Sequence, residues 1–343
     1  MKRHLLIWLG LAAALIVQAA LPAVPNLGNA RIIVLANNLQ NYYINYDESD
    51  RPSYSDDAGL ALKTQRIADM MIASNADIFA FCELEAKPVT LEHLVAALNE
   101  QLDCDCYAAV YDGINVATDR YDNAIKSGFA YRKATVAPYS SNYAATNVNY
   151  YKNTMRIQAW EELATGEKFT LSMNHFKAGQ TAADPGKRVT NAENLISGLS
   201  NSYKVKDPDI LIMGDLNAQM SEDCIGVIED AGFEEQLIRF DEDAYSYIYR
   251  SNYELIDHAF ANSTMAEQIT KAVVWHTNTA QSYSYRYSDH DAVLVGLRLG
   301  DEDPIIDGVE QVGTNPQVQK TMRHGQLIII RGGIEYTITG QRL

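Results

Sequence analysis

The segment DILIMGDLNA, residues 209–218, is the stretch that decides the expected fold. Its apolar run is continuous rather than alternating, which indicates a β-strand buried on both faces. The run stops abruptly at Asp215 and Asn217. DIFAFCELE, residues 77–85, follows the same pattern and delivers Glu83. Strands of this kind need a packed layer on each side, so the sequence predicts an α/β fold.

Helical and strand patterns alternate along the chain. Helical spacing is found at residues 62–75, at 90–102, with Thr90 expected as the N-cap, and at 187–201. The segment 156–176 predicts a β-hairpin that turns at Thr165 and Gly166. Residues 291–299 read as a last strand that closes the core. The mixture favours interleaved strands and helices over an all-α or all-β chain.

The N-terminus has the pattern of an export signal. Lys2, Arg3 and His4 precede the apolar run of residues 5–20, and Val17-Gln18-Ala19 is an acceptable cleavage site. The alternative is an uncleaved membrane anchor, but the run is shorter than the ~20 residues that span a bilayer. We therefore expect residues 1–19 to be a signal peptide and the mature protein to have no stable membrane insertion.

Export would place the four cysteines in an oxidising environment. Cys104 and Cys106 flank a single aspartate, so a bond between them is expected to be strained. A bond from either one to Cys224 is the alternative, and spacing alone does not decide the connectivity. Cys82 lies inside an apolar run and is expected to be buried.

The chain is acidic, with 28 Lys and Arg against 44 Asp and Glu and a formal net charge of −16. Non-specific nucleic-acid binding depends on phosphate neutralisation by Lys and Arg, so this balance argues against a protein that coats DNA. It leaves open an enzyme whose carboxylates hold a divalent cation, because the bound ion reverses the local charge.

Several apolar runs end in a polar cluster that is poor in lysine. These clusters contain Asn37, Asn38 and Asn41; Glu83 and Glu85; Asn174, His175 and Lys177; Asp215 and Asn217; Asp257 and His258; Asp289 and His290. Carboxylates gathered in this way repel one another, and burial makes the repulsion worse. A hard cation with oxygen ligands resolves the conflict, which favours Mg²⁺ or Mn²⁺, with Ca²⁺ as the alternative, over tetrahedral zinc.

The order of these motifs resembles the endonuclease/exonuclease/phosphatase superfamily, the metal-dependent phosphodiesterases related to pancreatic deoxyribonuclease. The motifs are NNLQN (37–41), ADIFAFCELE (76–85), GDLNA (214–218), IDHAF (256–260) and SDH (288–290). Residues 154–179 are similar to a segment of its secreted bacterial nuclease members. The resemblance covers residues 31–299 and implies a two-sheet β-sandwich flanked by helices, a four-layer αββα fold with the active site at one end.

The resemblance also implies roles for individual residues. Catalytic roles fall on His290, oriented by Asp257, on Asp215 and Asn217, and on His175. Metal-side roles fall on Glu83, Asn38 and Asp289, and phosphate-binding roles on Arg156 and Asn174. The family usually has Gln where this chain has Cys82, which we expect to fill space. Asp291 is expected to be a solvated or turn residue.

These features predict a secreted divalent-metal-dependent phosphodiesterase, most simply a nuclease acting on DNA, with RNA and other phosphodiesters as further substrates. The first alternative is a sphingomyelinase-like phosphodiesterase or an inositol-phosphate phosphatase-like enzyme. The second is a non-catalytic surface binding protein on the same fold. The tyrosine-rich segment 139–153 is expected either to line a substrate groove or to form a surface loop.

The domain organisation follows from composition. We expect a catalytic domain at residues 30–300, an acidic linker at 301–318 and a C-terminal tail at 319–343. Within the tail, two apolar segments meet at Gly332-Gly333, which predicts a β-hairpin. The tail resembles the C-terminal tails of exported Bacteroidetes proteins, which implies a sorting signal read by an outer-membrane secretion machinery. The alternative is a hairpin packed on the catalytic domain, and the protein would then be periplasmic rather than extracellular or on the cell surface.

Overall fold

The computed structural model describes residues 21–48, 52–113, 124–140, 143–144, 154–202 and 208–300, and three strands between 318 and 337. The expected signal peptide, most of the tyrosine-rich segment and nearly all of the expected linker lie outside the described residues. None of the helices among the described residues is long and apolar enough to cross a membrane. The chain divides into two compact units, residues 1–303 and 304–343.

The first sheet has six strands in the order β14-β15-β1-β2-β4-β3. Its members are β1 (Ile32–Tyr42), β2 (Ile78–Glu85), β3 (Tyr107–Ala109), β4 (Ile125–Arg132), β14 (Ile269–Trp275) and β15 (Ala292–Leu297). The central pair β1 and β2 is parallel, and all other neighbours are antiparallel. The last predicted strand, 291–299, is therefore confirmed as β15.

The second sheet has seven strands in the order β10-β13-β9-β8-β7-β5, and β6 also pairs with β7. Its members are β5 (Val136–Pro138), β6 (Tyr143–Ala144), β7 (Met155–Glu162), β8 (Lys168–His175), β9 (Ile210–Asp215), β10 (Phe233–Glu235) and β13 (Asp257–Asn262). The pair β8 and β9 is parallel. Strands β7 and β8 form the predicted hairpin, and Gly166 in its turn has a φ of 79°.

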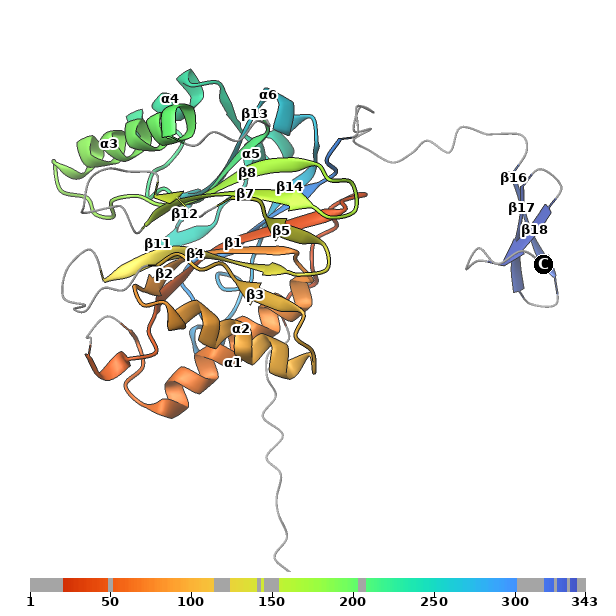
Figure 1. Ribbon diagram of the computed structural model, residues 1–343, viewed down its shortest axis with the longest axis horizontal. Coiled ribbons are helices and arrows are strands. Elements are labelled where there is room, and N and C mark those ends of the chain that lie inside the picture. The colour runs from red at the N-terminus through yellow and green to blue at the C-terminus, as the bar shows by residue number, and fades with distance from the viewer. Residues whose placement is uncertain are drawn as a thin grey trace, which may run out of the picture. The chain divides into compact units, whose positions relative to one another are not determined.

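The two sheets pack face to face and helices cover both outer faces (Figure 1). The helices are α1 (Asp57–Ser74) and α2 (Val89–Gln101) on the first sheet, and α3 (Asp184–Ser197) and α4 (Asp223–Asp230) on the second. Along β2, Ala80 and Cys82 face the second sheet, whereas Phe79 and Phe81 face the helices. Both faces are buried, which explains the continuous apolar runs and confirms the four-layer αββα fold.

Shorter elements connect these layers. They are β11 (Tyr247–Tyr249) and β12 (Asn252–Glu254), which form a separate two-stranded sheet, α5 (Gln236–Phe240), α6 (Ser263–Ala266), 3₁₀ turns at Tyr46–Glu48 and Tyr283–Tyr285, and a π-helical turn at Gly198–Ser202.

Helix ends differ from the predictions at three places. The first helix begins at Asp57, where the side chain of Asp56 accepts a hydrogen bond from the Gly59 backbone, and it ends as predicted at Asn75 in a left-handed conformation. The second has Pro88 at its N-cap, so the N-cap assigned to Thr90 is wrong. The third begins at Asp184 rather than residue 187. These helices begin with proline or polar residues, so they start before the apolar spacing by which the sequence predicts a helix.

The structure decides between the cysteine connectivities that spacing left open. Cys104 and Cys106 form a disulfide with their Cα atoms 5.4 Å apart. Cys82 and Cys224 are free and buried, so the alternative bond to Cys224 is wrong. Cys82 lies in the core between the sheets, as expected for a residue that fills space.

The second unit contains a three-stranded antiparallel sheet of β16 (Val318–Arg323), β17 (Gln326–Arg331) and β18 (Ile334–Thr337). Strands β17 and β18 form the predicted hairpin. Strand β16 was not predicted, because its segment lacks a clear apolar alternation.

Candidate active site

Asp215, at the end of β9, lies at the centre of a group of polar side chains at one end of the sandwich. Its Oδ2 atom accepts a hydrogen bond from Asn38 Nδ2 at 3.0 Å. The Nε2 atoms of His175 and His290 lie 3.6 and 3.7 Å from the same oxygen. These residues come from β1, β8, β9 and the segment before β15, so the predicted strand-end clusters do converge.

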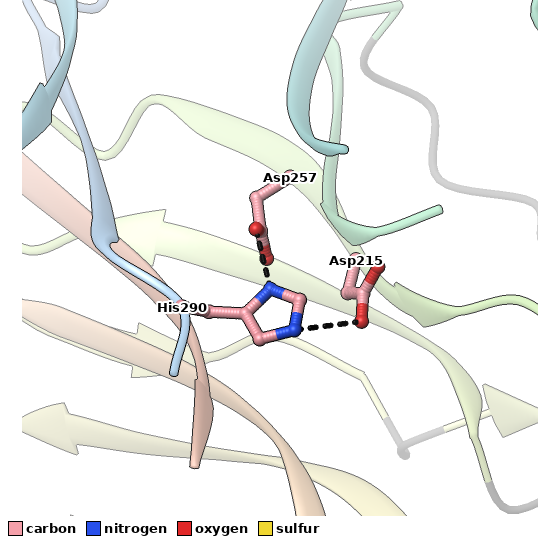
Figure 2. A group of neighbouring side chains, drawn as sticks. All are labelled: Asp215, Asp257 and His290. Carbon is pink, nitrogen blue, oxygen red and sulfur yellow. Dashed lines mark hydrogen bonds and ion pairs between the residues drawn. The ribbon is translucent and has the colours of Figure 1, made fainter. Parts of the chain in front are cut away.

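His290 lies between two carboxylates (Figure 2). Its Nδ1 atom is 2.7 Å from Asp257 Oδ2, while its Nε2 atom faces Asp215. Ser246 donates a hydrogen bond of 2.7 Å to the same Asp257 oxygen. Both members of the pair are buried. This geometry holds the imidazole with one nitrogen toward an orienting carboxylate and the other toward the site.

The electrostatic surroundings favour the protonated ring of His290. Burial acts to lower its pKa, but the carboxylates of Asp257, Asp215 and Asp289 outweigh burial and raise the pKa well above the usual value. The ring of Tyr247 lies against the imidazole, with the ring centroids 4.7 Å apart and the planes inclined by 33°. These surroundings favour the imidazolium form of His290, whose ring is covered by Tyr247 on one side.

Glu83 enters the site through an irregularity in β2. It adopts a left-handed conformation with a φ of 55°, at the point where the pairing of β2 with β4 shifts register. Its Oε1 atom accepts from Asn38 Nδ2 at 3.1 Å and its Oε2 atom from the Asn41 backbone at 2.9 Å. A register shift next to an active site turns a side chain out of the regular alternation, and here it turns the acid toward Asp215.

Asn38 bridges the two central carboxylates. Its Nδ2 donates to both Glu83 and Asp215, while its Oδ1 accepts from the Gln40 backbone at 2.8 Å. As placed, Asn38 separates and orients the two acids, and its own oxygen is already bonded. The expected metal-side role of Asn38 stays a prediction.

The turn after β9 places Asn217 beside Asp215. Asn217 has a φ of 49°, its backbone donates to Asp215 Oδ1 at 2.8 Å and its amide donates to the Phe176 carbonyl at 3.3 Å. Just before this turn, Gly214 lets β8 approach β9 closely, since a Cβ there would lie 2.0 Å from the Asn174 carbonyl oxygen. Asp215 and Asn217 therefore lie together, and their expected roles toward water and phosphate stay a prediction.

The residues around Glu83 fit a divalent cation. The Oδ1 atom of Asn41 and the Nε2 atom of His175 are buried and, within the described part of the chain, have no hydrogen-bond partner. Burial, Glu83 and Asp215 raise the pKa of Asp289, although His290 opposes them. A cation among these oxygens would relieve that repulsion and use the unpaired Asn41 oxygen.

A second ligand set is offered by Asp215, Asp257 and His290, whose ligand atoms lie within 4.8 Å of one another. The Oδ2 atom of Asp257 is already bonded to both His290 and Ser246. We therefore place the cation on the Glu83 side of Asp215. Asp289, with a side chain 39% exposed and 4.0 Å from His290, lies at the open edge of the group.

The two predicted phosphate-binding residues, Asn174 and Arg156, are both buried. Asn174 is fully buried, and its amide is bonded to the Met213 carbonyl and to the Ser172 hydroxyl. This arrangement does not support a phosphate contact, and Asn174 instead ties β8 to β9. Arg156 is buried on β7, where burial lowers its pKa and Asp112 opposes that effect.

Asp291 is not the solvated residue that the sequence suggested. It is fully buried and accepts hydrogen bonds from the backbones of Asn278 and Thr279, from the Thr279 hydroxyl and from His276 Nδ1. The side chain of Asn278 in turn donates to the His290 carbonyl at 2.7 Å. Asp291 therefore fixes the segment that presents His290.

Three further residues support the site without a clear signal in the sequence. Ser246 and Tyr247 hold Asp257 and His290 from the segment before β11 and from β11 itself. Lys63 of α1 donates to the Gln40 carbonyl at 2.7 Å and steadies the left-handed residues Gln40 and Asn41. Among these three residues, only Tyr247 had a signal in the sequence, the alternation of tyrosines along residues 245–249.

Comparisons with known proteins agree with this fold. No curated protein matches the chain. An endonuclease/exonuclease/phosphatase from Bacteroides vulgatus is 15% identical with a TM-score of 0.57, covering 78% of this chain and 98% of its own. The mannosyl-6-phosphatase of Bacteroides thetaiotaomicron is 16% identical with a TM-score of 0.54, covering 78% and 99%. D. rerio TDP2 in complex with a single-strand DNA product is 13% identical with a TM-score of 0.54, covering 78% and 98%.

At these identities the solved structures establish the fold alone. The sequence itself goes further, because the model of the Endonuclease/Exonuclease/phosphatase family matches residues 38–290. The match begins at Asn38, which bridges Glu83 and Asp215, and ends at His290. The chain belongs to the Endonuclease/Exonuclease/phosphatase family, whose members are metal-dependent phosphoesterases, and it has the fold of a phosphoester hydrolase.

Proposed function

We propose that this protein is a secreted nuclease that hydrolyses DNA phosphodiester bonds with Mg²⁺ or Mn²⁺. The observation that carries the hydrolytic part is the joint placement of His290, Asp215 and Glu83 around one small volume. A divalent cation held by Glu83, Asp289 and the Asn41 side chain would supply positive charge to phosphate oxygens and to the departing alkoxide. Ca²⁺ is the alternative ion for the same oxygen ligands.

The protein side chains divide the remaining work. Asp215, whose carboxylate is fixed by Asn38 and Asn217, orients the attacking water and accepts its proton. His290 keeps its proton because Asp257 faces Nδ1, so its Nε2 donates a hydrogen bond to a non-bridging phosphate oxygen. This assigns His290 as a cationic clamp on phosphate rather than as the base.

His175 is suited to the leaving-group side. Its Nε2 is buried, lies 3.6 Å from both Glu83 Oε1 and Asp215 Oδ2, and lacks a hydrogen-bond partner among the described side chains. A donor in this position is available to the phosphate or to the departing oxygen.

The β11–β12 hairpin supports a nucleic-acid substrate. It joins the site directly, because Tyr247 forms a β-bridge with His290. Tyr253 is 67% exposed, and the Arg250 guanidinium lies 5.1 Å from the Tyr249 ring centroid. An exposed tyrosine beside the site provides a face on which an unpaired base can stack. A single-stranded or frayed DNA end is therefore the preferred form of substrate.

Secretion is supported by the leader pattern of residues 1–19 and by the Cys104–Cys106 disulfide, since disulfides persist in oxidising compartments. The tail at 319–343 serves in this proposal as the signal for an outer-membrane secretion machinery. Deletion of the tail is expected to leave an active but mislocalised protein. An insoluble product would contradict the sorting role.

The test of the activity is a substrate panel. Purified full-length protein is incubated with single-stranded DNA, duplex DNA, RNA, sphingomyelin, an inositol phosphate and a bis-phosphodiester, each with Mg²⁺, Mn²⁺, Ca²⁺ or chelator. We expect metal-dependent cleavage that is fastest on single-stranded DNA. Preferred hydrolysis of sphingomyelin or inositol phosphate would replace the nuclease assignment, and no cleavage of any substrate would contradict hydrolysis.

A further inference from the structure

His258 was singled out by the IDHAF motif but has no part in the site described above. It follows Asp257 in β13, and its side chain is directed away from His290 because successive strand residues point to opposite faces. The residue is fully buried. Both ring nitrogens lie against acceptors, with Nδ1 3.0 Å from Glu235 Oε2 and Nε2 2.8 Å from the Ala218 carbonyl oxygen.

These contacts define where the protons lie. A carbonyl oxygen accepts only, so Nε2 must carry a proton to bond with Ala218. Glu235 is held in place by the backbones of Leu237 and Ala259, which donate to its Oε1 at 2.9 and 3.3 Å. The fixed carboxylate stabilises a second proton on Nδ1. His258 is therefore a buried donor on both sides, supported by a fixed acid.

The Ala218 carbonyl belongs to the turn that presents the catalytic residues. At the other end of this turn, the Leu216 backbone donates to the Ile256 carbonyl at 2.9 Å. Between the two anchors, Asn217 holds a left-handed conformation that an asparagine adopts only at a cost. The two anchors are Ile256, directly before β13, and His258 within it, on either side of Asp257.

We propose that His258 is a positioning residue for catalysis: held by Glu235, its ring fixes the Asp215–Ala218 turn so that Asn217 stays aligned with Asp215. Residues 256–258 thus contact two parts of the site. Asp257 orients His290, and the two flanking residues hydrogen-bond to the Asp215–Ala218 turn. This inference rests on the proposed hydrolytic function of Asp215 and Asn217. His258 itself touches neither substrate nor cation.

The expected kinetic effect follows from that indirect role. Loss of the ring donor loosens alignment in the transition state but leaves substrate and cation contacts intact. His258→Phe should therefore lower kcat by about 10- to 100-fold, the range for removing a residue that orients a catalytic group. KM and the metal concentration for half-maximal activity should be unchanged. Glu235→Gln keeps a side chain that can bond Nδ1 and leaves Nε2–H on the Ala218 carbonyl, so it should lower kcat less than His258→Phe does.

A matched control separates positioning from stability. Phe260 lies two residues further along β13 on the same face, is fully buried and contacts the His258 ring with centroids 5.4 Å apart. Phe260→Leu should lower the melting temperature without lowering kcat. Because His258→Phe leaves the Glu235 charge buried, the double variant Glu235→Gln/His258→Phe is measured as well. If Phe260→Leu and His258→Phe were equally stable and lowered kcat equally, the positioning role would be overturned.

Two measurements decide the proposal. In a double-mutant cycle, His258→Phe should lower kcat much less in an Asn217→Ala background than in wild type, and full additivity would overturn the proposal. Amide hydrogen exchange at residues 216–218 should accelerate in His258→Phe but not in Phe260→Leu. Hydrogen exchange is measured without substrate, so unchanged protection of residues 216–218 in His258→Phe would refute this inference alone. A wild-type protein without hydrolytic activity would refute the proposed function instead.

Discussion

The Nδ1 atom of His290 lies 2.7 Å from the Oδ2 atom of Asp257, although the two residues are 33 positions apart in the sequence. Asp257 begins β13 in the second sheet, whereas His290 precedes β15 in the first. The pair therefore bridges the two sheets at one end of the sandwich. Its geometry depends on the packing between the sheets, so the catalytic ring is oriented only in the fully folded protein.

Asp257→Asn should lower kcat by about 10²- to 10⁴-fold, because the amide neither holds Nδ1–H nor stabilises the imidazolium of His290. Steady-state kinetics on single-stranded DNA measure this effect. Asp230→Asn, at an exposed acid of α4, is the matched control and should behave like wild type. Near-normal turnover in a well-folded Asp257→Asn protein would remove Asp257 from the catalytic pair.

Glu83→Gln should raise the Mg²⁺ concentration for half-maximal activity by about 10-fold or more, since it removes a charged ligand. Binding of Mn²⁺ to the protein without substrate should weaken in parallel. Glu85→Gln is the control, because Glu85 accepts bonds from Ile44 and Asn45 outside the site. If both variants gave the wild-type metal titration, Glu83 would not bind the cation.

The sequence predicted the layers better than the details of the site. Continuous apolar runs identified buried strands such as β2 and β9, because a strand buried on both faces has apolar residues at successive positions. The polar strand ends located Asp215 and His290. The role of Asn174 could not be read in this way, since its two bonds to Ser172 and Met213 exist only once the strands pair.

Contacts between distant segments explain the other corrections. Asp291 looked solvated because its partners, Asn278 and Thr279, lie more than ten residues away and bond mainly through their backbones. Ser246 left no pattern at all, since a single hydroxyl on Asp257 has no periodic signature. Tertiary hydrogen bonds, unlike burial, leave no periodic record in the sequence.

His258 should make stability depend on pH. Burial acts to lower its pKa, but Glu235 and the Ala218 carbonyl outweigh burial and raise it above the unfolded value of about 6.5. A raised folded-state pKa contributes stability that is complete below about pH 6.5 and is lost as pH rises through the folded-state pKa. The unfolding free energy of wild type minus that of His258→Phe should therefore shrink toward alkaline pH. A difference that grows with pH would contradict a charged His258.

Tyr253→Ala should raise KM for single-stranded DNA by about 5- to 150-fold, the equivalent of about 1–3 kcal/mol for one stacked base. Hydrolysis of a small bis-phosphodiester, which has no base to stack, should be unaffected. Tyr139→Ala is the control and should leave both substrates unchanged, because this exposed ring lies 4.7 Å from Lys168 Nζ, at the end of β8 opposite to His175. Equal loss on both substrates would refute a stacking role for the β11–β12 hairpin.

The most direct test of the central claim compares wild type with His290→Ala on an end-labelled single-stranded oligonucleotide, with Mg²⁺ and with chelator. We expect wild type to cleave only with metal, and folded His290→Ala to be slower by about 10²- to 10⁴-fold at saturating metal. Cleavage by wild type in chelator, or wild-type turnover by His290→Ala, would contradict a metal-dependent phosphodiesterase built around His290.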